Sequence, residues 1–327
     1  MMGSVLVTGA SGFVGLNVLE CLLAQGRTVV GLSAGPVAAA VAGLAARRFA
    51  RLPGRPVEVQ GDVRDRVLLD ELMQRHDVGH VVHLAAITAG PLREREAAEQ
   101  IISVNLEGLA TVLAAAARRR VRRFVYTSSV AVYGGQPADG SLIDEDTPHS
   151  PQTLYAITKS AGEAVAQRLG ALHGIDVVVA RLGRVYGPFE HDTGVRDTLS
   201  QIHQVTQAAI AGRAVAFERP CVKNWCYAPD TAVRLGALLQ APPLQHRVYN
   251  LGSSYAWPLS VWCERLVERF PAFSYHVGTP LAADALPIDL GGNRDSGLLS
   301  WQRCADELNP APETPFDGAF EATLNAL

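Results

Sequence analysis

The stretch that decides the fold of this chain is Ser4-Val5-Leu6-Val7-Thr8-Gly9-Ala10-Ser11-Gly12-Phe13-Val14-Gly15. Its apolar start predicts a buried strand over 4–8, and the pattern that follows predicts a helix over 13–25. Gly9 permits the tight turn between the two, Gly12 lets backbone amides approach a pyrophosphate, and Gly15 lets the helix pack close to the sheet. Because the helix N-terminus adds partial positive charge, the unit is typical of a phosphate-cradling turn that binds a dinucleotide.

The same alternation of short apolar runs and helical windows continues through the first half of the chain. The runs lack a period of two, as expected for strands that are buried on both faces of a parallel sheet. The succession therefore predicts a doubly wound α/β fold with right-handed crossovers. Further strands are predicted at 27–32, 57–60, 79–84, 123–128 and 175–181, and helices at 65–75, 97–118 and 155–173.

The pattern changes after about residue 182, where glycines and prolines separate shorter elements. A helix over 230–240 and an apolar run over 247–251 are suited to return to the sheet. We therefore predict a dinucleotide-binding Rossmann domain and a smaller C-terminal substrate-binding lobe. The predicted Rossmann domain is 1–182 together with 224–253, and the predicted lobe is 183–223 together with 254–327.

The composition excludes several classes of protein. The chain has 327 residues, of which 48% are hydrophobic and 19% charged, so it can bury a full-sized core. A net charge of −3 argues against a basic nucleic-acid or membrane-surface protein, and no apolar stretch approaches the ~20 residues of a membrane span. The N-terminus lacks the features of a signal peptide, and the five cysteines show no metal-ligand or disulfide spacing. We therefore expect a cytoplasmic protein without structural metal, whose partner is a small molecule and neither a nucleic acid nor a membrane.

The end of the second predicted strand bears on the choice of dinucleotide. NAD-binding proteins usually place an acid there that grips the adenosine ribose, whereas this chain has Ser33. The missing carboxylate removes a repulsion against a 2′-phosphate, which favours NADP slightly and leaves both NAD and NADP open. Asp62 and Val63, after the third strand, suit an adenine contact; a helix N-cap formed by Asp62 or Asp65 is the alternative.

Two segments carry side chains for acid–base chemistry. Tyr155 and Lys159 are four residues apart at the start of a helix, so both lie on one face. The ammonium favours the phenolate and is expected to lower the phenol pKa from ~10, which suits a general acid/base for a carbinol proton. Ser128 and Ser129 end a buried strand, where open α/β sheets bind their ligands. Lys159 also stands out because the chain has 27 arginines and only two lysines, the other being Lys223.

These motifs resemble those of the extended short-chain dehydrogenases/reductases, and in particular the NAD-dependent epimerase/dehydratase family. The resemblance implies a Rossmann sheet with a small C-terminal substrate lobe, and a homodimer formed through the helices at 97–118 and 155–173. It covers nearly the whole chain and rests on TGASGFVG at 8–15, GDVRD at 61–65, HLAA at 83–86, Asn105, SSVAVYG at 128–134, YAITK at 155–159 and RLGRVYGP at 181–188.

By this resemblance Ser129 is the active hydroxyl, Tyr155 the acid/base and Lys159 its partner, which also holds the nicotinamide ribose. Asn105 is expected to brace the helix that carries the active site. The expected cofactor-binding residues are Gly9, Ser11, Gly12, Phe13, Val14, Gly15, Ser33, Asp62, Val63, Leu84, Ala85, Ala86, Asn105 and Lys159. The expected substrate-binding residues are Thr88, Ser128, Ser129, Arg184, Arg196 and Lys223.

The substrate segment departs from the patterns of the family's branches. Dehydratases have an Asp-Glu pair after the active hydroxyl, where this chain has Val130 and Ala131, so a 4,6-dehydratase is not expected. Epimerases usually read Asn-Val-Tyr-Gly-Pro, where this chain begins with Arg184. Arg184, Arg196 and Lys223 together are suited to clamp a carboxylate or phosphate of the substrate. The alternative for the arginines is a surface position that reflects the compositional bias.

Three functions follow from these residues. The one favoured by Arg184 is NAD(P)-dependent oxidation or reduction of a hydroxyl or carbonyl on a sugar, sugar acid or related anionic carbohydrate. The alternative is 4-epimerisation of a nucleotide sugar of the UDP-hexose type with tightly held NAD, which needs the same catalytic residues. The third is a non-catalytic dinucleotide sensor, against which the intact set of Ser129, Tyr155 and Lys159 argues.

Overall fold

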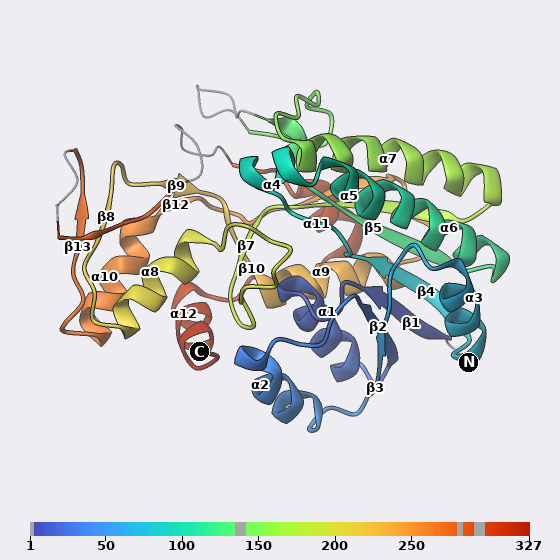
Figure 1. Cartoon of the computed structure of the whole chain (residues 1–327), viewed down its shortest axis with the longest axis horizontal. Helices are drawn as coiled ribbons and strands as arrows, with labels where there is room; N and C mark the ends of the chain where they lie inside the picture. Colours follow the sequence, from blue (N-terminus) through green and yellow to red (C-terminus); the bar gives the residue numbers. More distant parts are fainter. Residues whose placement is uncertain (1–2, 135–141, 280–283, 291–297) are drawn as a thin grey trace.

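A seven-stranded parallel sheet forms the centre of the protein, with a lobe of smaller sheets beside it (Figure 1). The computed structural model describes residues 3–134, 142–279, 284–290 and 298–327. The strand order β11-β6-β5-β4-β1-β2-β3 is that of a doubly wound sheet, which confirms the predicted fold class. The strands are β1 (Ser4–Thr8), β2 (Thr28–Ser33), β3 (Arg55–Gln60), β4 (Val78–His83), β5 (Arg123–Ser129), β6 (Asp176–Leu182) and β11 (Val248–Leu251).

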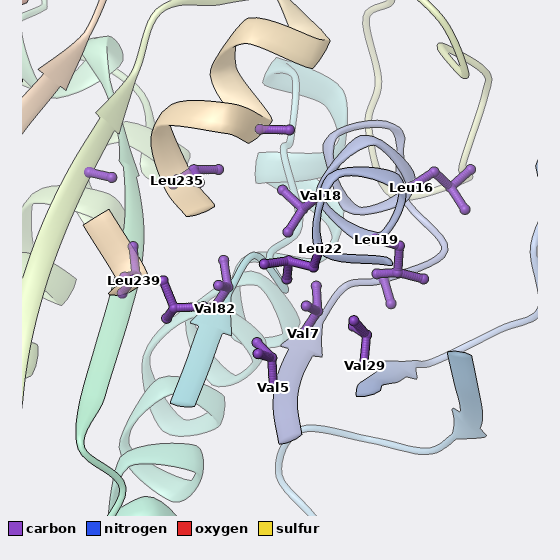
Figure 2. Packing of buried hydrophobic residues seen from close by; sticks show 14 of the residues in the cluster. Val5, Val7, Leu16, Val18, Leu19, Leu22, Val29, Val82, Leu235 and Leu239 are labelled. Atoms are coloured by element: carbon purple, nitrogen blue, oxygen red, sulfur yellow. The ribbon is translucent and has the colours of Figure 1, made fainter. Parts of the chain in front are cut away.

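Helices cover both faces of this sheet. On one face, α1 (Phe13–Ala24), α2 (Ala39–Phe49) and α9 (Ala228–Gln240) pack against the strands, and Figure 2 shows side chains of α1 and α9 meeting those of β1 and β4. On the other face, α3 (Arg66–Arg75), α6 (Gly108–Arg118) and α7 (Leu154–His173) bury a second apolar core. Since every interior strand contributes to both cores, its sequence has apolar residues on both faces and does not alternate between apolar and polar.

The predicted helix at 97–118 is interrupted by one turn of π-helix. It consists of α5 (Ala98–Ile102), the π turn η1 (Ser103–Glu107) and α6, and the short helix α4 (Pro91–Glu96) precedes it. By length and composition the stretch Ala98–Arg118 is apolar enough to cross a membrane, so the prediction that no apolar stretch approaches the length of a membrane span is wrong. Leu109, Val112 and Leu113 of α6 are fully buried in the second core, so this is a core helix of the folded protein.

The C-terminal lobe is built from short strands around an aromatic core. Trp262 is fully buried there and contacts Tyr186, Trp257 and Phe320 through its ring. The strand pairs are β7 (Arg184–Tyr186) with β10 (Trp225–Tyr227), β9 (Val222–Lys223) with β12 (Trp257–Pro258), and β8 (Val215–Phe217) with β13 (Tyr275–Val277) and β14 (Leu286–Pro287). The helices of the lobe are α8 (Gln201–Ile210), α10 (Leu259–Arg269) and α12 (Phe316–Leu324).

One element of the C-terminal segment lies with the large sheet. Helix α11 (Gln302–Leu308) packs against β11 and α9, and Cys304 is part of the first core. The predicted lobe at 254–327 includes this helix, because the loop-rich sequence around it gives no sign of where the helix packs. The division into domains at residue 182 stays a prediction.

The strands that carry the site end together at one edge of the sheet. Thr8 at the end of β1 is in register with Leu32 of β2 and His83 of β4. On the other side of β4, Ser129 at the end of β5 is in register with Leu182 of β6. The residues that follow each strand therefore meet at one edge, where doubly wound folds bind ligands.

His83 lies fully buried at this edge and makes the fold sensitive to acid. Its Nδ1 is 2.9 Å from the Thr8 hydroxyl oxygen, and its ring stacks on Tyr126. Burial lowers the pKa of His83 to about 3. Because a base with a lowered folded-state pKa binds its proton in the unfolded chain first, this contribution to stability is complete above pH ~6.5 and is lost as the pH falls toward 3.

We expect His83→Asn to remove part of this acid sensitivity. Asparagine can keep the hydrogen bond to Thr8 but does not titrate. Between pH 7 and pH 5 the free energy of unfolding of the wild type should fall by about 2 kcal/mol more than that of the variant. Urea unfolding at the two pH values measures the difference. Equal losses in both proteins would mean that another group, such as His80 with its lowered pKa, causes the acid sensitivity.

Candidate active site

A cavity of about 760 Å³ opens at the carboxyl edge of the sheet, between the large sheet and the lobe. Its wall includes the glycine-rich turn after β1, the ends of β2, β4 and β5, the start of α7, and the segment between β7 and α8. Of the predicted site residues, all except Asn105 and Lys223 line this cavity. Such a concave site at the switch point of a doubly wound sheet is where this architecture binds its ligands.

The glycine-rich turn is shaped to leave backbone exposed to a ligand. Gly9 has a φ of +70°, and its amide donates to the Leu32 carbonyl at 2.8 Å. A Cβ on Gly15 would lie 2.2 Å from the Gly9 carbonyl oxygen, so only glycine lets α1 start so close to the turn. Gly12 precedes the first residue of α1. The turn thus offers the amide-lined cradle and helix N-terminus that fit the pyrophosphate of a dinucleotide.

At the ribose side of this cradle, Ser33 is tied to the turn itself. The Ser11 amide donates to the Ser33 hydroxyl oxygen at 2.8 Å, a contact that an acid could also accept. Asp62 is held by Arg64 through two side-chain bonds of 2.9 and 2.5 Å, and this guanidinium lowers the pKa of the Asp62 carboxyl. The N-cap of α3 is Asp65, which accepts from two backbone amides. Asp62 therefore lines the cavity wall, and its negative charge is paired with Arg64.

Ser129 and Tyr155 meet at the other end of the cavity. Ser129 ends β5 and caps a 3-10 turn over Val130–Tyr133. Tyr155 lies in the first turn of α7 and lines the cavity with Ser129 and Thr88. Burial raises the pKa of Tyr155, although the hydroxyls of Ser129 and Thr88 and the charge of Arg196 act in the opposite direction.

Lys159 lies one turn further along α7 and is fully buried. Its Nζ donates to the Thr127 carbonyl at 2.7 Å and lies 5.0 and 5.9 Å from the ring centres of Tyr126 and Tyr155. Burial lowers the pKa of Lys159 to about 8. Burial outweighs the other effects on the Tyr155 phenol, so the expected lowering of its pKa by Lys159 stays a prediction. The ammonium points at Thr127, and the desolvation of the phenol has the larger effect.

Asn105 sits in the π turn and acts inside the protein. Its Oδ1 accepts from the Ile87 amide at 2.8 Å, and its Nδ2 donates to the Ile87 carbonyl and to the Thr158 hydroxyl. It thereby ties α7 to the loop after β4. Asn105 does not line the cavity among the described residues, so its predicted contact with the cofactor has no geometric support here.

Lys223 also lies outside the cavity in the part of the chain that the structure describes. It is 0% exposed, and its Nζ donates to the Leu290 carbonyl and, at 3.3 Å, to the Gln201 side chain. Burial lowers the pKa of Lys223 to about 8. The expectation of a direct contact between Lys223 and a substrate anion is therefore corrected, because the ammonium donates to Leu290 and Gln201 behind the cavity wall.

The two arginines of the predicted clamp do line the cavity. Arg184 starts β7, and burial lowers its pKa. Arg196 lies over the ring of Phe13, with its guanidinium carbon 5.6 Å from the ring centre, and is held by Glu190 at 3.2 Å. A short parallel bridge between Thr88 and Arg196 fixes this segment to the loop after β4.

Some predicted and some unpredicted residues complete the wall. Ser128 lines the cavity, but its hydroxyl donates to Glu163 at 2.5 Å, so its proton is already engaged inside the protein. The polar stretch at 189–199 carries hydrogen-bonding groups in the sequence and supplies several of the residues that the site prediction missed. Gln100, Gln201 and Asp289 come from distant segments and carry no local sequence signal. The missed polar residues of the wall include Arg64, Gln100, His191, Asp192, Thr193, Thr198, Ser200, Gln201 and Asp289.

Comparison with curated proteins gives relatives with related chemistry. The chain is 35% identical over 199 residues to a dTDP-glucose 4,6-dehydratase of Streptomyces niveus, a match that covers 57% of this chain and 55% of that protein. It is 31% identical to the low-salt glycan biosynthesis protein Agl12 of Haloferax volcanii, over 81% of each chain. It is 30% identical to UDP-glucuronate 4-epimerase 4 of Arabidopsis thaliana, over 81% of this chain and 63% of that one.

Solved structures of similar shape agree on the fold. MoeE5 in complex with UDP-glucuronic acid and NAD has a TM-score of 0.78 at 22% identity, and the match covers 99% of this chain and 98% of MoeE5. The UDP-glucose 4-epimerase of Thermus thermophilus in complex with NAD has a TM-score of 0.78 at 23% identity, with the same coverage.

A family model supplies the assignment. The model for the NAD dependent epimerase/dehydratase family matches residues 5–252, which include the glycine-rich turn and the segment from Ser129 to Lys159. With the relatives above, this match shows that the chain is an enzyme of the NAD-dependent epimerase/dehydratase family, within the extended short-chain dehydrogenases/reductases.

Proposed function

We propose that this enzyme is an NAD-dependent 4-epimerase of a nucleotide sugar. The observation that carries the proposal is that Ser129, Tyr155 and Lys159 lie at the wall of one cavity with the glycine-rich turn. Val130 and Ala131 line the same cavity in place of the Asp-Glu pair of dehydratases, so these two positions supply no acid for the loss of water. The relatives include UDP-glucuronate 4-epimerases, which favours this function over the net dehydrogenase that the sequence analysis preferred.

The side chains divide the proton chemistry between them. Tyr155, as phenolate, takes the proton of the sugar hydroxyl and later returns it to the carbonyl oxygen. Ser129 donates a hydrogen bond to that same oxygen, and Lys159 supplies positive charge behind the phenol. The glycine-rich turn would hold NAD, which would supply the acceptor and donor of hydride. Epimerisation also requires that the cavity leave the sugar room to turn over between oxidation and reduction.

NAD is the cofactor that the described residues suit. Arg64 lies near the ribose side but is bound to Asp62, and Arg48 is bound to Glu20 on the neighbouring surface. A 2′-phosphate would have to compete with Asp62 for Arg64. The solved relatives described above also contain NAD. The expected slight preference for NADP, drawn from Ser33, is not supported by these comparisons.

Exposed apolar side chains on two helices support a homodimer. Ile102 of α5 is 44% exposed and Ile157 of α7 is 48% exposed, on the helices through which the family resemblance implies a dimer. A homodimer that covers them would remove this apolar surface from water. Sedimentation at several concentrations measures the oligomeric state directly.

All five cysteines are unpaired, which suits a reducing compartment such as the cytoplasm.

The bound dinucleotide distinguishes the epimerase from the second candidate, a net dehydrogenase. An epimerase regenerates its cofactor in place, so we expect the purified protein to release about one NAD per chain on denaturation, as measured by mass spectrometry. Incubation of the same protein with UDP-glucuronate or UDP-glucose should then yield the 4-epimer without added dinucleotide. A protein that is purified empty and consumes NAD or NADP stoichiometrically would be a dehydrogenase of the kind that Arg184 first suggested.

We expect Tyr155→Phe to lower turnover by about 10²–10⁴-fold, because the phenol is the acid/base. Dinucleotide binding, followed by fluorescence titration, should be retained. Tyr126→Phe is the matched control: Tyr126 is buried next to Lys159, and its hydroxyl has no hydrogen-bond partner among the described residues. Loss of turnover in both variants, or in neither, would contradict the role of Tyr155.

We expect Arg196→Gln and Arg184→Gln to raise the KM for UDP-glucuronate about 10–100-fold, and the KM for UDP-glucose much less. The physical reason is the loss of a charge-assisted hydrogen bond to the sugar carboxylate. Arg93→Gln is the control, since Arg93 binds Asp197 of the same segment at 2.6 Å but does not line the cavity among the described residues. Equal effects on the two substrates would assign the arginines to the diphosphate or to packing, and not to a sugar carboxylate.

A further inference from the structure

Glu163 is a buried carboxylate that the mechanism above does not use. It lies on α7 one turn after Lys159 and two turns after Tyr155, so all three share the face that packs on the sheet. Only 4% of Glu163 is exposed. A carboxylate is costly to bury unless it is paired and hydrogen-bonded, which makes its partners informative.

The carboxylate of Glu163 is fully engaged by two neighbouring strands. Arg181 of β6 donates to it through Nε at 2.9 Å and through its terminal nitrogen at 2.7 Å. Ser128 of β5 donates to it at 2.5 Å. His149, before α7, has its Nε2 3.7 Å away. Burial lowers the pKa of His149, and the Glu163 charge opposes this shift.

Glu163 and Lys159 hold consecutive residues at the end of β5. Lys159 donates to the carbonyl of Thr127, and Glu163 accepts from the hydroxyl of Ser128. The next residue is Ser129, which meets the Tyr155 phenol. Two buried groups of opposite charge on one helix therefore determine where the active hydroxyl is presented.

Glu163 also acts on Lys159 electrostatically. The groups that face Lys159 are His83 of β4, Tyr126 of β5 and Tyr155 of its own helix. None of these three is a carboxylate. Among the described residues, Glu163 is the one carboxylate whose charge opposes the lowering of the Lys159 pKa by burial.

We propose that Glu163 is a positioning residue for the reaction, whose carboxylate keeps the buried Lys159 ammonium charged and fixes the strand end that presents Ser129. The inference rests on the proposed function only in that Ser129, Tyr155 and Lys159 carry the chemistry. Its electrostatic part concerns a property of Lys159 that is measurable without any substrate.

The composition of the chain makes that measurement simple, because Lys159 and Lys223 are its only lysines. Incorporation of lysine labelled with ¹³C at Cε gives two signals, and Lys223→Arg assigns them. Titration of the Lys159 signal yields its pKa in the intact protein, expected at about 8. In Glu163→Gln, which keeps the size and an acceptor for Ser128, we expect this pKa to fall by about one unit or more.

A variant that keeps the Arg181 partner of the Glu163 carboxylate serves as a control. Ser128→Ala removes the hydrogen bond to β5 and leaves the ion pair with Arg181 in place. We expect the pKa of Lys159 to stay unchanged in Ser128→Ala, whereas its turnover should fall several-fold at every pH. Unchanged turnover in Ser128→Ala would contradict the positioning of Ser129, which keeps the proposal testable should Glu163→Gln fail to fold.

The pH profile of turnover gives a second readout. Activity that needs the ammonium is lost as the pH rises through the pKa of Lys159, so this alkaline limb should move to lower pH in Glu163→Gln and not in Ser128→Ala. An unchanged Lys159 pKa in Glu163→Gln, or an equal fall in Ser128→Ala, would overturn the proposal. Either result would leave the epimerase activity itself, tested by dinucleotide and product, unaffected.

Discussion

The parallel register of the central sheet places Thr8, His83 and Ser129 at one edge, and the glycine-rich turn and the proposed catalytic residues are positioned from there. Because the strands run in one direction, the loops that follow β1, β2, β4 and β5 all open into the same cavity. A shift of one residue in any of these strands would turn its side chains to the other face of the sheet. The two buried cores, one on each face, oppose such a shift, since both would lose their packing at once.

Beneath the cavity the protein buries charged groups and satisfies them with each other. Lys159, Glu163 and Arg181 are each at most 5% exposed. Lys159 donates to Thr127 of β5, and Glu163 accepts from Ser128 of β5 and from Arg181 of β6. Breaking such a buried pair costs about 3–5 kcal/mol, because one charge is left without a partner. The network is therefore rigid, and rigidity of the groups behind the reacting atoms is what catalysis by preorganised charge requires.

The substrate side of the cavity is held by polar contacts of the segment before α8. Arg196 is bound to Glu190, which in turn accepts from the amide and hydroxyl of Ser200 at the start of α8. The bridge from Thr88 to Arg196 joins this segment to the large sheet. The lobe can thus vary its cavity-lining residues while the catalytic side stays fixed, which is consistent with a family whose members act on different nucleotide sugars.

The spacing of the glycines in the sequence predicted the glycine-rich turn. The sequence also predicted the central sheet, because each of the seven predicted apolar runs forms one of its strands. It also brought Tyr155 and Lys159 onto one helix face, since their spacing is local. It did not determine the direction of the Lys159 ammonium, the burial of Lys223, or the π turn that carries Asn105. Those depend on partners far away in the chain, such as Thr127, Leu290 and Thr158. Periodicity reports which face of an element is buried, whereas only tertiary packing decides which buried polar group meets which, because each must find a partner within hydrogen-bond distance.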